Sequence, residues 1–374
     1  MLRVPSRPPG LLPALAATCL LTLGACDAPG RGRPAAIDEG RRKELAARWS
    51  LYLSGDPKWP AAREEWMAGP EEERDLLLDN LLIELLRDDA ASRGSGTSQR
   101  SARARRELAW FGADAVPLLE EAMRGLARRD AVDVVAVDRV GLALVELRAT
   151  TELAALCAAP DRAGAGAAGL QLQLAAIRAL AHLDEPAATA ALVERLESDP
   201  SWQVRGAAAE VLRRRAGSIE VRAALFGALS DPDGFVRAQA VRALVAEINP
   251  AEEGGALLRA LSILLQDPSA TTRAAAAEAL ALFAFDPRVE LALTHALVDR
   301  DLAVVQKAAL ALRSRRTPAV QRALVDALER AVKARADGLV SELLLVLESN
   351  VGARPRNLNP GGWRELLARR QGSR

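Results

Sequence analysis

The chain has 374 residues, with 50 Lys and Arg against 49 Asp and Glu, so its formal net charge is +1. A near-neutral chain lacks the basic footprint with which a dedicated nucleic-acid-binding protein displaces counterions from phosphate, so we expect no nucleic-acid partner. Half of the residues are apolar, which excludes a disordered chain, and only two His and three Cys are available for metal binding or acid/base chemistry. We therefore expect no cofactor, no metal site and no catalysis.

The first residues have the features of an export signal. Arg3 and Arg7 precede an apolar run, Leu11 to Ala25, that is shorter than the roughly 20 residues of a membrane-spanning helix. The run ends in Leu23-Gly24-Ala25-Cys26, which resembles the lipobox of bacterial lipoproteins. The resemblance implies cleavage between Ala25 and Cys26, and a lipid on the Cys26 thiol that holds the protein on the extracytoplasmic face of a membrane. Both the inner and the outer membrane fit this motif, and an ordinary export signal is the alternative.

Composition and hydrophobic periodicity divide the rest of the chain into a cap, a repeat region and an end segment. Apolar residues recur at three- and four-residue steps from residue 37 onward, and Trp49, Trp59 and Trp66 are expected to fill the core of an N-terminal helical cap. The expected segments are a signal peptide (1–25), a linker (26–36), the cap (37–90), a flexible loop (91–100), a repeat solenoid (101–350), and a C-terminal loop with a short helix (351–374).

A repeat is clearest in the centre of the chain. Asp199, Asp231, Asp267 and Asp299 start units that are spaced 32, 36 and 32 residues apart. In each unit Val or Thr follows five residues later, Ala nine later and Leu thirteen later, which places these residues on one buried face of a helix. Pro follows the Asp in the first three units, so we expect the Asp to cap the helix and the Pro to lie in its first turn.

These units resemble the short HEAT-like repeats named after phycobilisome lyases, which run Asp-Pro, then Val-Arg, then Ala and Leu. The resemblance implies an all-α fold, a right-handed solenoid of antiparallel helix pairs similar to armadillo-type superhelices, with the second helices on its concave side. Tetratricopeptide repeats have a similar period and are the alternative. The Trp, Leu-Gly and Tyr pattern of that family is missing, and the chain has a single Tyr.

Arginine recurs six residues after the Asp in three units. Arg205, Arg237 and Arg273 should therefore stack into a ladder that faces the Asp residues of neighbouring loops, and Val305 should end it. Because Asp and Arg recur together, we interpret the ladder as a device that fixes the packing of one repeat on the next, rather than as a direct ligand site.

Trp202 and Phe235 stand at neighbouring places in successive second helices, outside the buried face. Together with Gln239 and Arg242 they form a candidate partner-binding strip, because aromatic residues are frequent hot spots of protein interfaces. Packing between repeats explains the two aromatic residues equally well.

Four other features are assigned no function. Gly164-Ala165-Gly166-Ala167-Ala168-Gly169 matches a dinucleotide fingerprint but follows a helical segment, so we interpret it as a loop. His182 and His295 lack a second His at metal spacing, and Cys157 lies in an apolar stretch, as a buried residue would. The basic group of Arg93, Arg100, Arg103, Arg105 and Arg106 is interpreted as a solvated face, with contact to anionic headgroups as the alternative.

The sequence thus predicts a lipid-anchored protein of the bacterial cell envelope that acts as a scaffold or assembly factor for envelope proteins. The alternative is an accessory or lyase-like subunit of an enzyme system, with a small molecule or chromophore in the concave groove. Only the analogy of fold supports that alternative.

Overall fold

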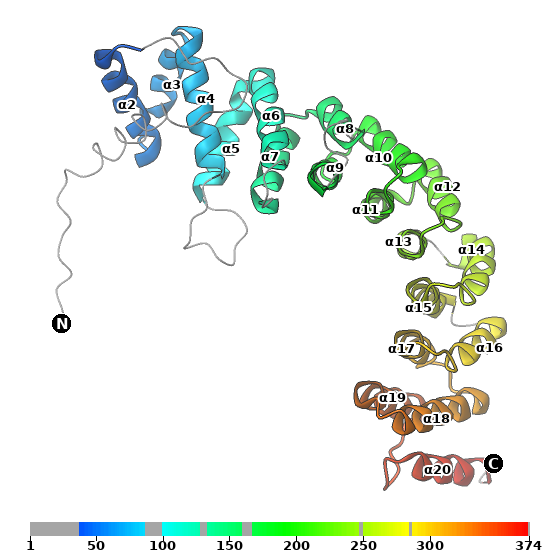
Figure 1. Ribbon diagram of the computed structural model, residues 1–374. Coiled ribbons are helices and arrows are strands. Elements are labelled where there is room, and N and C mark those ends of the chain that lie inside the picture. Colours follow the sequence, from blue (N-terminus) through cyan, green and yellow to red (C-terminus); the bar gives the residue numbers. More distant parts are fainter. Residues whose placement is uncertain are drawn as a thin grey trace, which may run out of the picture. The chain divides into compact units, whose positions relative to one another are not determined.

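A computed structural model describes residues 37–86, 99–127, 133–158, 167–246, 250–283 and 286–372. Within these ranges the chain is helical and contains no strand (Figure 1). The chain divides into two compact units, Met1–Ala149 and Thr150–Arg374, so the boundary lies inside the segment expected to be one solenoid. The predicted signal peptide, with Ala25 and Cys26, and nearly all of the linker lie outside the described residues.

The first unit contains the expected cap and an additional set of helices. Its Trp59 and Trp66 are buried, the Nε1 of Trp66 donates to the carbonyl of Glu73 over 2.7 Å, and the Glu73 carboxylate accepts two hydrogen bonds from Arg41, at 2.7 and 2.8 Å. The tryptophans therefore form the core of this unit. The helices are α2 (Glu39–Ser54), α3 (Trp59–Met67), α4 (Glu71–Leu86), α5 (Gln99–Phe111), the 3-10 turn η3 (Gly112–Ala115), α6 (Val116–Ala127) and α7 (Val134–Glu146).

The second unit is a stack of helix pairs. Its helices are α8 (Thr150–Ala158), α9 (Ala167–Leu180), α10 (Pro186–Ser198), α11 (Trp202–Leu212), η4 (Arg213–Arg215), α12 (Ile219–Ala228), α13 (Gly234–Leu244), α14 (Pro250–Leu264), α15 (Ala270–Ala279), η5 (Leu280–Phe283), α16 (Pro287–Ala296), α17 (Leu302–Ala311), α18 (Pro318–Lys333), α19 (Asp337–Val351) and α20 (Pro360–Gly372). We call α9, α11, α13, α15, α17 and α19 the second-helix row, and α8, α10, α12, α14, α16 and α18 the first-helix row. Within this unit the second-helix row lies on the inside of the curve (Figure 1).

Small residues hold the second-helix row together. The four recurring alanines, Ala208, Ala240, Ala276 and Ala308, are completely buried, and the leucines that follow four residues later are buried with them. An Ala at each crossing lets neighbouring helices approach closely, and successive helices of this row contact one another throughout. The all-α solenoid predicted from the repeat is confirmed.

Helix starts differ from expectation at several places. The residue that caps a second helix is Ser201, Asp233, Ser269 or Asp301, which lies two residues after the recurring Asp. The prediction that the Asp caps the helix and the Pro lies in its first turn is therefore wrong, because the Asp carboxylate is engaged in the ladder described below.

Three other elements begin earlier than the sequence suggested. Helix α5 begins at Gln99, so residues 99 and 100 of the expected flexible loop are helical. Helix α9 includes Gly169 and begins at Ala167. Helix α20 begins at Pro360, and its buried Trp363 and Leu367 cover the last pair as a terminal helix would.

Candidate functional site

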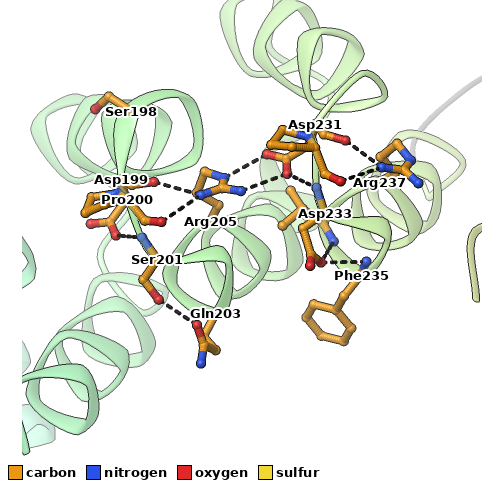
Figure 2. Close-up of polar contacts among 12 residues, drawn as sticks. Ser198, Asp199, Pro200, Ser201, Gln203, Arg205, Asp231, Asp233, Phe235 and Arg237 are labelled. Atoms are coloured by element: carbon orange, nitrogen blue, oxygen red, sulfur yellow. Dashed lines mark hydrogen bonds and ion pairs between the residues drawn. The ribbon is translucent and has the colours of Figure 1, made fainter. Parts of the chain in front are cut away.

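The three recurring arginines each connect two successive loops of the second unit. The Nε and Nη2 atoms of Arg205 donate to the two carboxylate oxygens of Asp231, in the next loop, at 2.7 and 2.8 Å (Figure 2). Its Nη1 donates to the carbonyls of Asp199 and Pro200, in its own loop, at 2.9 and 3.2 Å. The same four contacts recur for Arg237 with Asp267, Asp231 and Pro232, and for Arg273 with Asp299, Asp267 and Pro268.

We call these three pairs the Asp–Arg ladder. The paired arrangement is the geometry in which guanidinium and carboxylate groups bind most strongly, and these side chains are largely buried. Each Asp carboxylate also accepts a hydrogen bond from the backbone amide two residues later, which is 2.8 Å long for Asp231, Asp267 and Asp299. One carboxylate therefore fixes both the turn of its own loop and the position of the preceding repeat.

The electrostatics agree with this geometry. Burial is the largest single effect and would raise the pKa of Asp231 and Asp267. The hydrogen bonds from Arg205 and Arg237, those from the backbone amides and the arginine charges together outweigh it, so both pKa values lie below the ordinary range. The hydrogen bond from Arg273 lowers the pKa of Asp299 in the same way. The carboxylates of the ladder are therefore held in their charged form.

The ladder changes at both ends. At its start, Gln173 stands where the later helices have Arg, and its amide donates to Asp199 over 3.3 Å, while Arg195 lies 3.5 Å from the same carboxylate. At its other end, Val305 replaces the Arg, and Ala334 stands three residues before α19, where the earlier units have Asp. Sequence reasoning missed Gln173, although the Ala and Leu that follow three and seven residues later, Ala176 and Leu180, mark its place in the repeat.

A second set of polar contacts was not anticipated. Arg215 donates to the carbonyls of Leu180 and Leu183 at the end of α9, and Arg315 donates over 2.9 Å to the carbonyl of Phe283 at the end of η5. Asn350, which is fully buried, donates to three carbonyls that follow α17. Burial lowers the pKa of both arginines. These side chains satisfy carbonyls that helix ends leave without intrahelical partners. Arg215 and Arg315 stand 16 residues after Asp199 and Asp299, but the two units between them have Glu247 and Phe283 at that place, so the spacing gave no signal.

The aromatic pair lies on the second-helix row. The rings of Trp202 and Phe235 meet edge to face, with centroids 5.6 Å apart, and the side chains are 43% and 38% exposed. A Cβ at Gly206 would lie 2.6 Å from Cε1 of Phe235, so the ring lies directly on the backbone of α11. Each ring thus packs between repeats with one part and presents its remaining surface to solvent.

Gln239 and Arg242 lie beside this pair. Nη1 of Arg242 donates to Gln239 over 2.9 Å, and Gln239 donates to Glu210 of the preceding repeat over 3.4 Å. These contacts join the strip residues Gln239 and Arg242 to α11. A similar contact joins Lys307 to Glu278, at 2.7 Å, between α17 and α15.

The remaining candidates are placed as follows. Arg105 pairs with Glu146 at 2.6 Å and Arg103 lies over the ring of Tyr52, whereas Arg93 is outside the described residues. Cys157 is buried, and burial raises the pKa of its thiol to about 12. Within the described ranges, no group of His, Cys, Asp and Glu is arranged to hold a metal ion, and no helix is long and apolar enough to span a membrane.

Stacked helix pairs that are joined by recurring loop contacts define an all-α solenoid. A family model for HEAT repeats matches residues 166–245, 189–262 and 257–339, so the helix pairs of this part of the chain are similar to HEAT repeats. No curated protein matches the sequence significantly.

Among solved structures, the karyopherin Kap121p bound to Pho4p is 14% identical, over 95% of this chain and 41% of that chain, with a TM-score of 0.50. The Escherichia coli protein YibA is 13% identical, over 69% and 98%, with a TM-score of 0.43. The complex of CpcE and CpcF of phycocyanin lyase from Nostoc sp. PCC7120 is 19% identical, over 62% and 94%, with a TM-score of 0.34. At these identities the likeness concerns the fold alone.

Proposed function

We propose that this HEAT-repeat protein is a lipid-anchored scaffold or assembly factor of the bacterial cell envelope, and that it binds another envelope protein without catalysing a reaction. The observation that carries the proposal is the half-exposed pair of Trp202 and Phe235 on the inside of the second unit. Exposed aromatic side chains on a scaffold of this kind are frequent anchors of protein interfaces.

Rigidity supports this assignment. Phe235 rests on Gly206, and the helices that carry the pair are joined by the contact of Arg205 with Asp231. Gln239 and Arg242 are held beside them by hydrogen bonds. A surface that is already ordered loses little conformational entropy when a partner binds, so a small aromatic patch can contribute much of the affinity.

The partner surface is tested by photo-crosslinking in cells. A photoactivatable phenylalanine analogue replaces Trp202, and the matched control carries it at Ile219, which is 83% exposed on the first-helix row. We expect one envelope protein to crosslink from position 202 and not from position 219, and Phe235→Ala to reduce that crosslink while helicity is unchanged. The same set of crosslinked proteins from both positions would contradict the proposal.

The membrane anchor is supported by the order of features in the sequence: the basic start, the apolar run and Leu23-Gly24-Ala25-Cys26. We expect Cys26→Ala to move the protein from the membrane fraction to the soluble fraction, and the mature wild-type protein to carry the mass of a diacylglyceryl group. A control, Cys157→Ala, alters a buried thiol and should leave the protein in the membrane fraction. If the Cys26 variant stays membrane-bound, the lipobox interpretation is wrong, whereas the crosslinking result is independent of it.

A further inference from the structure

A groove lies on the first-helix row of the second unit, between the end of α14 and helix α16, both labelled in Figure 1. Its volume is about 450 Å³ and it is open to solvent. One wall is the connection from α14 to α15, with Leu265 and Pro268, and the other is α16, with Ala292, His295 and Ala296.

Small side chains on α16 line this groove. Ala292 and Ala296 stand seven and three residues before the ladder residue Asp299; α12 has Ala224 and Ala228 at the same distances before Asp231, whereas α10 has Leu192 and Leu196 before Asp199. The unit that precedes α16 is also the longest, at 36 residues, and its first helix α14 has 15 residues against ten in α12 and α16. The groove therefore lies where the repeat departs from its regular length.

One large aliphatic side chain of the groove is exposed to solvent. Val298 lines the groove and is 64% exposed, and Leu265, Ala292 and Ala296 add apolar surface to its walls. Apolar side chains that line an open, concave surface favour a binding site over an ordinary solvated face.

The charge at one end of the groove is positive. The carboxylates of Asp299 and Asp267 are already paired with Arg273 and Arg237, at 2.7 and 2.6 Å. Arg300 lines the same end and is exposed; its charge acts on Asp299 from a distance, and within the residues that the structure describes it forms no ion pair at contact distance. The charge available to a ligand is thus that of a guanidinium, which favours a carboxylate.

We infer that this groove binds a short acidic segment of a partner protein, with an aliphatic or aromatic side chain between α14 and α16 and a carboxylate beside Arg300. The inference goes beyond the proposed function, because the groove lies on the other helix row from Trp202 and Phe235. It gives the solenoid two separate binding surfaces, which is what an assembly factor that brings two proteins together requires.

An array of immobilised 12-residue peptides tests the inference, with apolar, acidic, basic and neutral residues varied systematically and the purified full chain as the probe. We expect the wild-type protein to retain peptides that combine a Leu or Phe with an Asp or Glu within two residues. Ala292→Phe fills the groove and should weaken this binding about tenfold, the loss expected when one large apolar side chain can no longer be buried. Ala303→Phe, at an exposed position of α17 outside the groove, is the matched control and should bind normally.

The variant Arg300→Glu separates the contribution of charge to peptide binding from the contribution of apolar contacts. It should abolish the preference for acidic residues and favour Lys or Arg at the same position in the peptides. The double variant Trp202→Ala, Phe235→Ala should leave the pattern of bound peptides unchanged. Failure of the groove to bind peptides can therefore be distinguished from failure of the proposed function. The inference is overturned if no peptide class is retained, if Ala292→Phe binds like Ala303→Phe, or if only purely apolar peptides are selected with no response to Arg300→Glu.

Discussion

Replacing Arg237 with Met tests whether the ladder holds neighbouring repeats together. Arg237 donates four hydrogen bonds, two to the Asp267 carboxylate and two to the carbonyls of Asp231 and Pro232. At about 1 kcal/mol for each bond, the loss amounts to about 4 kcal/mol, within the range of about 3–5 kcal/mol for breaking a buried ion pair from one side. Met keeps most of the apolar stem of Arg, so lost packing contributes little.

The measurement is urea unfolding, followed by circular dichroism and by hydrogen exchange of α13 and α15, because repeat arrays need not unfold in a single step. Arg288→Met is the matched control, since Arg288 pairs with Asp286 at 2.7 Å while its side chain is 82% exposed, and we expect no measurable change. In a double-mutant cycle with Asp267→Asn, the two substitutions should couple by about 1–3 kcal/mol. The reasoning is refuted if Arg237→Met destabilises the protein no more than Arg288→Met does.

Three further predictions concern the second unit. Because the pKa values of Asp231, Asp267 and Asp299 are lowered on folding, their stabilising effect is complete above the ordinary aspartate pKa of about 4 and is lost as pH falls through the lower native values. The urea concentration at the midpoint of unfolding should therefore decrease as the pH is lowered below about 4. This decrease should be less steep in the Arg237→Met variant. Gly206→Ala should destabilise the protein by about 1–3 kcal/mol, because the new Cβ meets the Phe235 ring, and Phe235→Ala should remove that penalty in a double variant. Since the pKa of the buried Cys157 thiol is raised to about 12, iodoacetamide at pH 8 should modify it only after unfolding; modification at the rate of an exposed cysteine would contradict this placement.

The fold could be predicted from the sequence because its repeat is a local pattern. Val, Ala and Leu at fixed offsets from each Asp mark one face of a helix, and Ala208 and its three equivalents are indeed completely buried. Ladder partners could also be named in advance, since Asp and Arg recur with the same period. What the period could not show is direction: each Arg pairs with the Asp of the following loop while it binds the carbonyls of its own.

Features without a period were harder to predict. The groove between α14 and α16 is lined by residues that include Leu265, Ala292 and Arg300, from two loops and a helix, which come together only when the helices are placed in space. The helix caps were misassigned because Asp-Pro is a common helix start, and the carboxylate had a stronger partner in the neighbouring repeat than the amides of its own helix.

The two ends of the ladder differ in whether both residues of an Asp–Arg pair are replaced or only the Arg. Between α17 and α19 both are absent, Val305 in place of the Arg and Ala334 in place of the Asp, so no charge is left buried without a partner. Between α9 and α11 only the Arg is replaced, and the buried Asp199 is instead contacted by Gln173 and by Arg195 of its own repeat. A single unpaired charge in these loops would cost several kcal/mol, whereas loss of the whole pair costs little. The ladder can therefore end at a repeat boundary only by losing both residues of a pair or by gaining a substitute donor. This chain loses both residues between α17 and α19, and it has substitute donors between α9 and α11.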